Sequence, residues 1–98
     1  MIKHVVLLNW KDGVTPAQID HVTASFAQLR EQIAEIKLYQ FGPDAGVFQR
    51  NASYALVAEF ENEADLKTYA KHPLHQAFLA DVAGPILDSF QSIQFVID

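Results

Sequence analysis

The sequence contains no cysteine. A disulfide framework and a thiolate metal site are therefore both excluded, and a reducing compartment such as the cytoplasm fits this composition. Basic residues are also few, because seven Lys and Arg, scattered singly, stand against twelve Asp and Glu and leave a net charge of −5. Nucleic acids and anionic membrane surfaces are bound by clustered basic charge, so we expect neither as a partner.

Long apolar runs are absent as well. The N-terminal stretch, residues 1–8, is too short to cross a bilayer or to form the apolar core of a signal peptide followed by a cleavage site. We therefore expect an intracellular, cytoplasmic protein. With 50% hydrophobic and 19% charged residues the chain has ordinary globular composition, and its 98 residues predict a single domain, residues 1–98.

Turn signals and apolar periodicity divide the chain into regular elements. Thr15 as N-cap, Pro16 at the first helical position and Gln18 completing a capping box predict a helix that runs to about Ala34. A second helical region is interrupted at His72-Pro73. Strands are expected over 2–10, 37–41, 54–60 and 89–97, and helices over 16–34, 63–70 and 73–82. The order βαββαβ predicts an α+β, ferredoxin-like fold with a four-stranded antiparallel sheet.

The sheet is expected to have two apolar faces. The first strand presents His4 and Val6 on one face and Val5 and Leu7 on the other, but helices on one side can cover only one face. An exposed apolar patch of this size usually marks an interface, so we predict a homodimer that pairs two sheets. The alternative is that the irregular segment 43–52 folds over the second face.

The segment from Tyr69 to His75 is the best candidate for chemistry, because histidine titrates near neutral pH. In a helix beginning at Pro73, His75 shares the apolar stripe with Phe78, Leu79 and Val82. It is either a hydrogen-bonded core histidine or an acid/base residue lining a pocket between sheet and helices. If the Tyr69 hydroxyl bonds to His75, the two form one acid/base unit. His4 is similarly placed inward.

The remaining candidates have simpler interpretations. His72 is expected to end one helix and cap the next, and His21 to be solvated. We expect no metal site at His72 and His75, because no carboxylate is suitably placed beside them. Trp10 and Tyr54 pack either in a dimer-facing layer or in the aromatic wall of a pocket.

Three segments of the chain, Ile2–Trp10, Tyr54–Phe60 and the Tyr69-x-x-His-Pro-x-His75 element, resemble the stress-responsive dimeric α/β-barrel (Dabb) domain family from end to end. The resemblance implies a ferredoxin-like protomer whose sheet pairs with a second copy to form an α/β barrel. Many members of this family have no defined reaction and are described only as stress-induced.

One branch of that family, the plant olivetolic acid cyclases, closes a polyketide ring by an aldol step without a cofactor. The tyrosine and histidine that act together in that branch match Tyr69 and His75, and a strand-one histidine matches His4. A further pocket histidine of the branch is replaced here by Tyr54. We therefore predict His75 as general base, Tyr69 orienting it, and His4 stabilising or relaying charge.

The predicted ligand is a small apolar carbonyl or polyketide-like compound, and we expect no cofactor. The substrate-binding wall is predicted to comprise Tyr54, Trp10, Leu56 and Phe78. Two alternatives to a cyclase- or lyase-type enzyme remain. One is a non-enzymatic homodimer whose histidines complete a structural core, and the other is a cofactor-independent oxygenase.

Overall fold

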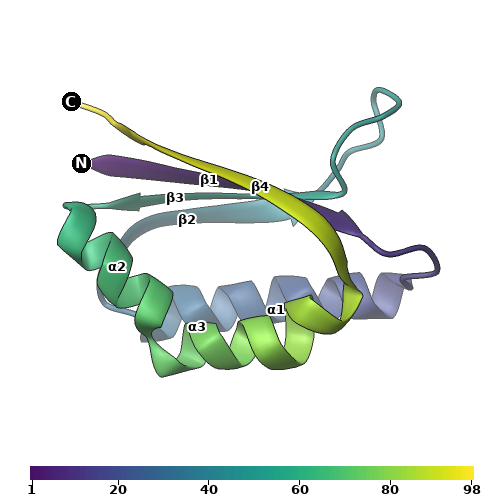
Figure 1. The fold of residues 1–98 in the computed structure, drawn as a ribbon, viewed down its shortest axis with the longest axis horizontal. Helices are drawn as coiled ribbons and strands as arrows, with labels where there is room; N and C mark the ends of the chain where they lie inside the picture. Colours follow the sequence, from purple (N-terminus) through teal and green to yellow (C-terminus); the bar gives the residue numbers. More distant parts are fainter.

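A computed structural model of the protein covers residues 1–98 and contains one four-stranded sheet with helices packed on one face (Figure 1). All neighbouring strands are antiparallel, and the sheet order is β2-β3-β1-β4. This arrangement confirms the predicted ferredoxin-like βαββαβ fold. The elements are β1 (Ile2–Trp10), α1 (Pro16–Gln32), β2 (Ile36–Pro43), β3 (Tyr54–Phe60), α2 (Glu63–Lys71), α3 (Pro73–Phe78), a π-helical turn (Leu79–Ala83), a 3-10 turn (Gly84–Ile86) and β4 (Leu87–Val96).

Helix α1 begins as the sequence predicts. The Thr15 side chain accepts a hydrogen bond from the backbone N–H of Gln18, and the Gln18 side chain accepts one from the Thr15 N–H at 2.8 Å. This reciprocal bonding satisfies two of the N–H groups that a helix start leaves unpaired. The helix ends two residues earlier than expected, at Gln32, and its buried stripe includes Val22 and Phe26.

Strand β2 is longer than predicted, because Gly42 and Pro43 continue the pairing with β3 rather than ending it. Proline lacks an N–H donor and is therefore confined largely to edge strands. Strand β2 is an edge strand, so Pro43 can occupy it. The backbone N–H of Asp44 then closes the loop by donating to the Ser53 carbonyl at 2.9 Å.

The helical region after Pro73 also departs from the prediction. It is α-helical only to Phe78 and continues as a π-helical turn to Ala83. A π turn inserts an extra residue and rotates the positions that follow. Ala83 is buried and lines the space between sheet and helices, while Val82, which the α-helical periodicity placed inward, is only partly buried against the core and also lines a groove beside α1.

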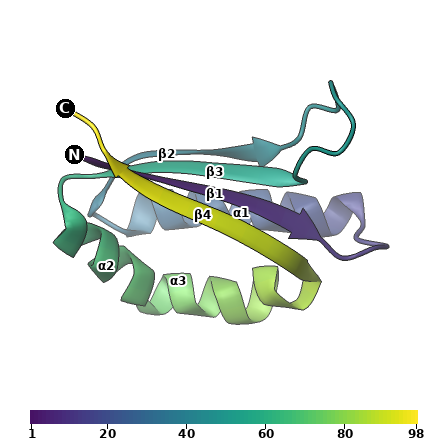
Figure 2. The ribbon, with the colours of Figure 1, turned by 45° about the horizontal axis from the view of Figure 1, so that its top comes forward.

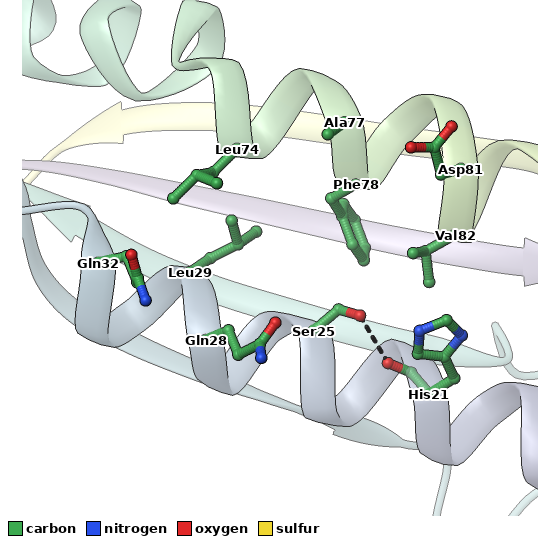
Figure 3. Close-up of a pocket in the computed structure, with 10 residues that line it drawn as sticks. All are labelled: His21, Ser25, Gln28, Leu29, Gln32, Leu74, Ala77, Phe78, Asp81 and Val82. Atoms are coloured by element: carbon green, nitrogen blue, oxygen red, sulfur yellow. Dashed lines mark hydrogen bonds between the residues drawn. The ribbon is translucent and has the colours of Figure 1, made fainter.

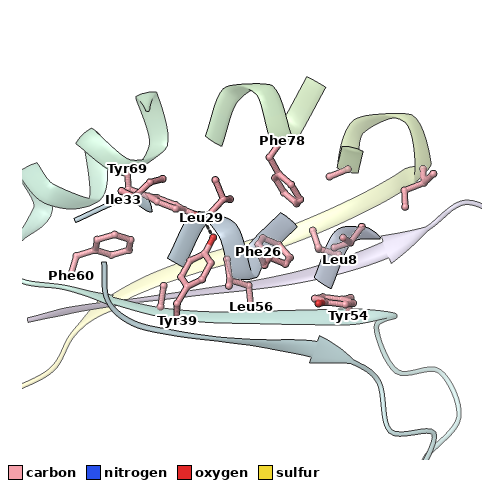
Figure 4. Packing of buried hydrophobic residues seen from close by; sticks show 14 residues of the cluster. Leu8, Phe26, Leu29, Ile33, Tyr39, Tyr54, Leu56, Phe60, Tyr69 and Phe78 are labelled. Atoms are coloured by element: carbon pink, nitrogen blue, oxygen red, sulfur yellow. Dashed lines mark hydrogen bonds between the residues drawn. The ribbon is translucent and has the colours of Figure 1, made fainter. Parts of the chain in front are cut away.

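The core lies between the sheet and the helices (Figure 4). At its centre Phe26 packs against several aromatic rings, the nearest being Phe78 at a centroid separation of 4.6 Å. Fourteen residues are buried: Leu8, Val22, Phe26, Leu29, Ile33, Tyr39, Tyr54, Leu56, Ala58, Phe60, Tyr69, Phe78, Ala83 and Ile86. None of the helices has the length and apolar character needed to cross a membrane.

The opposite face of the sheet carries no covering element (Figure 2). Leu7, Ile93 and Phe95, which lie on this face, remain 41%, 60% and 45% exposed. The loop between β2 and β3 does not fold over them, contrary to the alternative raised from the sequence. It projects beyond the end of the sheet (Figures 1 and 2). Val47 and Phe48, which belong to this loop, are exposed.

Candidate functional site

A largely apolar cavity of about 220 Å³ lies between the sheet and the α2–α3 region. Its polar side chains are those of His4, Tyr69, His75 and Ser92. The sequence had singled out the first three as catalytic candidates, and the fold brings all three to one space. Residues from every layer of the fold line the cavity: His4, Val6, Leu8, Phe26, Leu56, Leu66, Tyr69, Ala70, His75, Phe78, Leu79, Ala83, Leu87, Phe90 and Ser92.

The fold fixes which nitrogen of His75 carries a proton. Its Nδ1 lies 3.1 Å from the carbonyl oxygen of Ala70 in the last turn of α2. A carbonyl oxygen can only accept a hydrogen bond, so Nδ1 carries the hydrogen and donates it. The neutral ring therefore has a bare Nε2 lone pair, which is the atom that can act as a base.

His4 has the opposite tautomer. The Gln94 amide nitrogen on β4 lies 2.9 Å from Nδ1 of His4 and donates to it, so Nδ1 is the unprotonated nitrogen. The hydrogen of the neutral ring is then on Nε2. One cavity thus contains an imidazole that can accept a proton and another that can donate a hydrogen bond.

Burial lowers the pKa of both histidines below the ordinary value of 6.5. For His4, the nearby His75 adds to the lowering of the pKa. For His75, the hydrogen bond to Ala70 opposes the effect of burial, and His72 adds a smaller lowering. Both rings are consequently neutral at pH 7, and this is the protonation state that their different tautomers require.

Tyr69 contacts His75, but through ring packing rather than a hydrogen bond. The two ring centroids are 4.4 Å apart, whereas the Tyr69 hydroxyl is hydrogen bonded to the hydroxyl of Tyr39 at 2.6 Å (Figure 4). The Tyr69–His75 hydrogen bond considered from the sequence is therefore absent. Burial raises the pKa of Tyr69 to about 12, so its phenol keeps its proton and can serve as a donor.

The four residues predicted to bind substrate fall into two groups. Leu56 and Phe78 line the cavity, whereas Trp10 and Tyr54 lie outside its lining. The latter two pack together on the helix-facing side of the sheet with centroids 5.8 Å apart, so the dimer-facing placement considered for them is wrong. The Tyr54 hydroxyl bonds to Thr23 at 2.7 Å.

His72 has the capping role that the sequence predicts. Its Nδ1 accepts a hydrogen bond from the N–H of Leu74 at 3.1 Å, and its own N–H closes α2 on the Tyr69 carbonyl. His21 is exposed, as expected. The structure places no group of three or more His, Asp or Glu side chains where a metal ion could be held.

A second hollow of about 300 Å³ lies on the surface between α1 and α3 (Figure 3). His21 and Asp81 stand on its two sides, and the Ser25 hydroxyl donates to the His21 carbonyl at 2.8 Å. Its polar side chains are solvated, and neither His21 nor Asp81 has a fixed polar partner. The cavity that contains His4 and His75 is therefore the better candidate for chemistry.

Two residues of the site were not identified from the sequence. Tyr39 and Gln94 were each assigned only to an expected strand, over 37–41 and 89–97. The contact between Gln94 and His4 follows from the β1–β4 register, and that between Tyr39 and Tyr69 from the packing of α2 over β2. A sequence contains no signal for either pairing, since 90 and 30 residues separate the partners.

Fold and cavity together define a ferredoxin-like domain with an apolar, imidazole-lined site between its sheet and its helices. Residues 2–97 match the profile of the family described as "Stress responsive A/B Barrel Domain", and the chain belongs to this family. A curated relative is the stress-response A/B barrel domain-containing protein HS1 of Arabidopsis thaliana. It is 30% identical over 87 residues, which cover 87% of this chain and 80% of HS1.

Two further relatives are informative. Olivetolic acid cyclase of Cannabis sativa is 26% identical over 99% of this chain and 93% of its own length. The second is a dimeric ferredoxin-like protein of unknown function from Thermobifida fusca, known from its crystal structure, whose sequence is 36% identical to this chain. Its TM-score is 0.91, and the match covers 98% of this chain and 90% of that one.

Proposed function

We propose that the cavity binds a small carbonyl compound and that His75 removes a proton from the carbon next to the carbonyl group. The observation that carries this proposal is the opposed tautomers of the two imidazoles. Among the side chains that line the cavity, His75 has a bare Nε2, His4 an Nε2–H and Tyr69 a phenol O–H. A base and two donors around one apolar space suit the formation of an enol or enolate.

The proposed step is balanced without any further reagent. The C–H bond breaks and its proton passes to Nε2 of His75. The electron pair of that bond forms a C=C bond to the carbonyl carbon, and the π pair of the C=O bond moves to the oxygen. Hydrogen bonds from Tyr69 and His4 stabilise the charge that develops on that oxygen. An aldol-type ring closure or its reverse would use the same groups, and the name of the cyclase relative indicates a ring closure.

The size and lining of the cavity limit the ligand. Its volume of about 220 Å³ lies below the range typical of sites for drug-sized ligands. No Lys, Arg, Asp or Glu lines it. A small, neutral, mostly apolar compound therefore fits better than a charged metabolite, and Tyr54, which lies outside the lining, need not take part.

We further propose that the protein functions as a homodimer joined through the uncovered face of the sheet. Leu7, Ile93 and Phe95 form an apolar surface there that no part of the same chain covers. The Thermobifida relative, at 36% identity, is described as dimeric, which supports the same arrangement here. The cavity lies on the other side of the sheet, so the dimer would leave it accessible.

Hydrogen–deuterium exchange into phenylacetone tests the proposed proton abstraction without knowledge of the natural substrate. The ketone is incubated with the protein in D₂O, and loss of its α-proton signal is followed by NMR. We expect the wild-type protein to accelerate exchange well beyond free imidazole at the same concentration. His75→Gln should remove the acceleration, by about 100-fold or more if His75 is the general base.

His21→Gln is the matched control, because it makes the same substitution at an exposed histidine outside the cavity. It should exchange deuterium as fast as the wild type. Equal rates for His75→Gln and wild type, with both proteins folded, would overturn the assignment of His75. No acceleration by the wild type would favour the non-enzymatic alternative, in which the histidines only complete hydrogen bonds inside the fold.

A further inference from the structure

Tyr39 is a buried polar residue that the proposed chemistry does not yet use. Its side chain extends from β2, is 3% exposed, and does not line the cavity. Tyr69 is 1% exposed and does line it. The hydroxyl–hydroxyl distance of 2.6 Å is short for this kind of hydrogen bond, and Figure 4 shows the Tyr39 oxygen directed at Tyr69.

Only one of the two hydroxyls can donate in this bond. The Tyr39 hydroxyl has no partner other than Tyr69. If Tyr69 were the donor, the hydrogen of Tyr39 would be buried without an acceptor, at a substantial free-energy cost. If Tyr39 is the donor, its hydrogen is satisfied, and the hydrogen of Tyr69 is free to turn toward the cavity.

We infer that Tyr39 is a positioning residue, whose hydroxyl donates to the Tyr69 oxygen and so directs the Tyr69 hydroxyl hydrogen at a ligand in the cavity. This inference rests on the proposed function, since it supplies the orientation that carbonyl recognition by Tyr69 requires. The resulting chain runs from Tyr39 through Tyr69 to the carbonyl oxygen of the ligand. Each bond in such a chain polarises the next and strengthens it.

The acidities of the two phenols agree with this direction. Burial raises the pKa of both, but the shared hydrogen bond raises the pKa of Tyr39 further and lowers that of Tyr69. Donating therefore holds the proton on Tyr39, and accepting makes Tyr69 the better acid of the two. The phenol nearer the ligand is thus also the one better suited to donate to a carbonyl oxygen.

The first test uses the ligand-free wild-type protein with tyrosine labelled at ¹³Cζ. In mixed H₂O and D₂O, a hydroxyl that exchanges slowly gives two resolved ¹³Cζ signals, whereas a fast one gives a single averaged signal. We expect slow exchange at Tyr39, whose hydrogen is enclosed, and faster exchange at Tyr69, whose hydrogen faces the cavity. Slow exchange at Tyr69 with fast exchange at Tyr39 would overturn the inference.

The second test compares the binding of phenylacetone with that of propylbenzene, which has a similar shape but no carbonyl oxygen. In NMR titrations, Tyr39→Phe should weaken phenylacetone binding by about fivefold and leave propylbenzene binding unchanged. Tyr54→Phe is the matched control. It removes the hydroxyl of another buried tyrosine, which is hydrogen bonded at 2.7 Å to Thr23 and lies outside the cavity lining. This variant should keep the wild-type preference.

The outcomes separate this inference from the proposed function. A wild-type preference for phenylacetone that Tyr39→Phe leaves intact would refute the positioning role alone. No wild-type preference for the ketone over the hydrocarbon would refute carbonyl recognition itself. If Tyr39→Phe fails to fold, the hydroxyl exchange of the wild-type protein decides the matter.

Discussion

The rings of Tyr69 and His75 pack with their centroids 4.4 Å apart, yet no hydrogen bond joins them. Each residue is instead held by a different partner, the tyrosine by the Tyr39 hydroxyl and the histidine by the Ala70 carbonyl. The two rings therefore contact each other by packing alone, and neither residue depends on the other for its hydrogen bond. Both Tyr69 and His75, which lie six residues apart in the chain, line the same cavity.

The tautomers of the two cavity histidines can be observed directly. Long-range ¹H–¹⁵N correlation spectra at pH 7 should show His75 protonated at Nδ1 and His4 protonated at Nε2. Both rings should titrate below 6.5, because burial lowers their pKa values. A positively charged ring at neutral pH, or the same tautomer for both, would contradict the site described above.

These lowered pKa values predict how stability depends on pH. Between the folded-state pKa and 6.5, the unfolded chain binds more protons at His4 and His75 than the folded chain does. The free energy of unfolding is therefore fully retained above pH 6.5 and falls as the pH drops through that value. Urea denaturation at pH 7.5 and 5.5 measures the loss, which should be smaller in His75→Gln. An identical loss in the two proteins would show that His75 does not contribute.

The uncovered sheet face predicts where dimerisation can be blocked. Ile93→Asp places a charge in the middle of the proposed interface and should convert a species of twice the chain mass into a monomer in analytical ultracentrifugation. Val96→Asp is the matched control. It alters an even more exposed apolar residue of the same strand, whose position in the β1–β4 register puts it on the helix-facing side. A wild-type protein that sediments as a monomer at micromolar concentration would refute the dimer.

The capping role of His72 predicts a stability effect without a binding effect. His72→Ala removes the acceptor for the Leu74 N–H and should lower the free energy of unfolding by about 1 kcal/mol. His72→Asn restores a capping acceptor and should recover most of that loss. Neither variant should change the ratio of phenylacetone to propylbenzene binding, and a large change in that ratio would place His72 in the site after all.

Gly84 is predicted to be essential for the π-helical turn that forms one wall of the cavity. A Cβ atom at this position would lie 2.5 Å from the carbonyl oxygen of Leu79, so the backbone must shift to admit it. Gly84→Ala should cost about 1–3 kcal/mol and disturb Leu79 and Ala83 in the cavity wall. At Gly42 a Cβ would meet no atom within 4 Å, so Gly42→Ala should be near neutral in chemical denaturation. Similar losses in the free energy of unfolding for both variants would show that the cost does not come from the contact with the Leu79 carbonyl.

Local patterns accounted for much of this molecule. The Thr15–Gln18 capping box, the break at His72-Pro73 and the alternation in the strands depend on residues close together in the chain, and all three appear in the structure. The π-helical turn was missed because it interrupts a pattern that looks α-helical throughout. The turn is closed by the N–H of Gly84, which donates to the Leu79 carbonyl, and the apolar spacing of residues 79–83 does not distinguish this pairing from an α-helical one.

The inward placement of His4 and His75 was determined by the sequence, because strand and helix periodicities assign side chains to faces without knowledge of their partners. What those side chains do was decided only by the tertiary structure. Their tautomers depend on the Ala70 carbonyl and on Gln94, and the orientation of Tyr69 depends on Tyr39. A hydrogen bond is sensitive to changes of a few tenths of an ångström in its donor–acceptor distance. Between elements far apart in the chain, only the completed packing sets that distance.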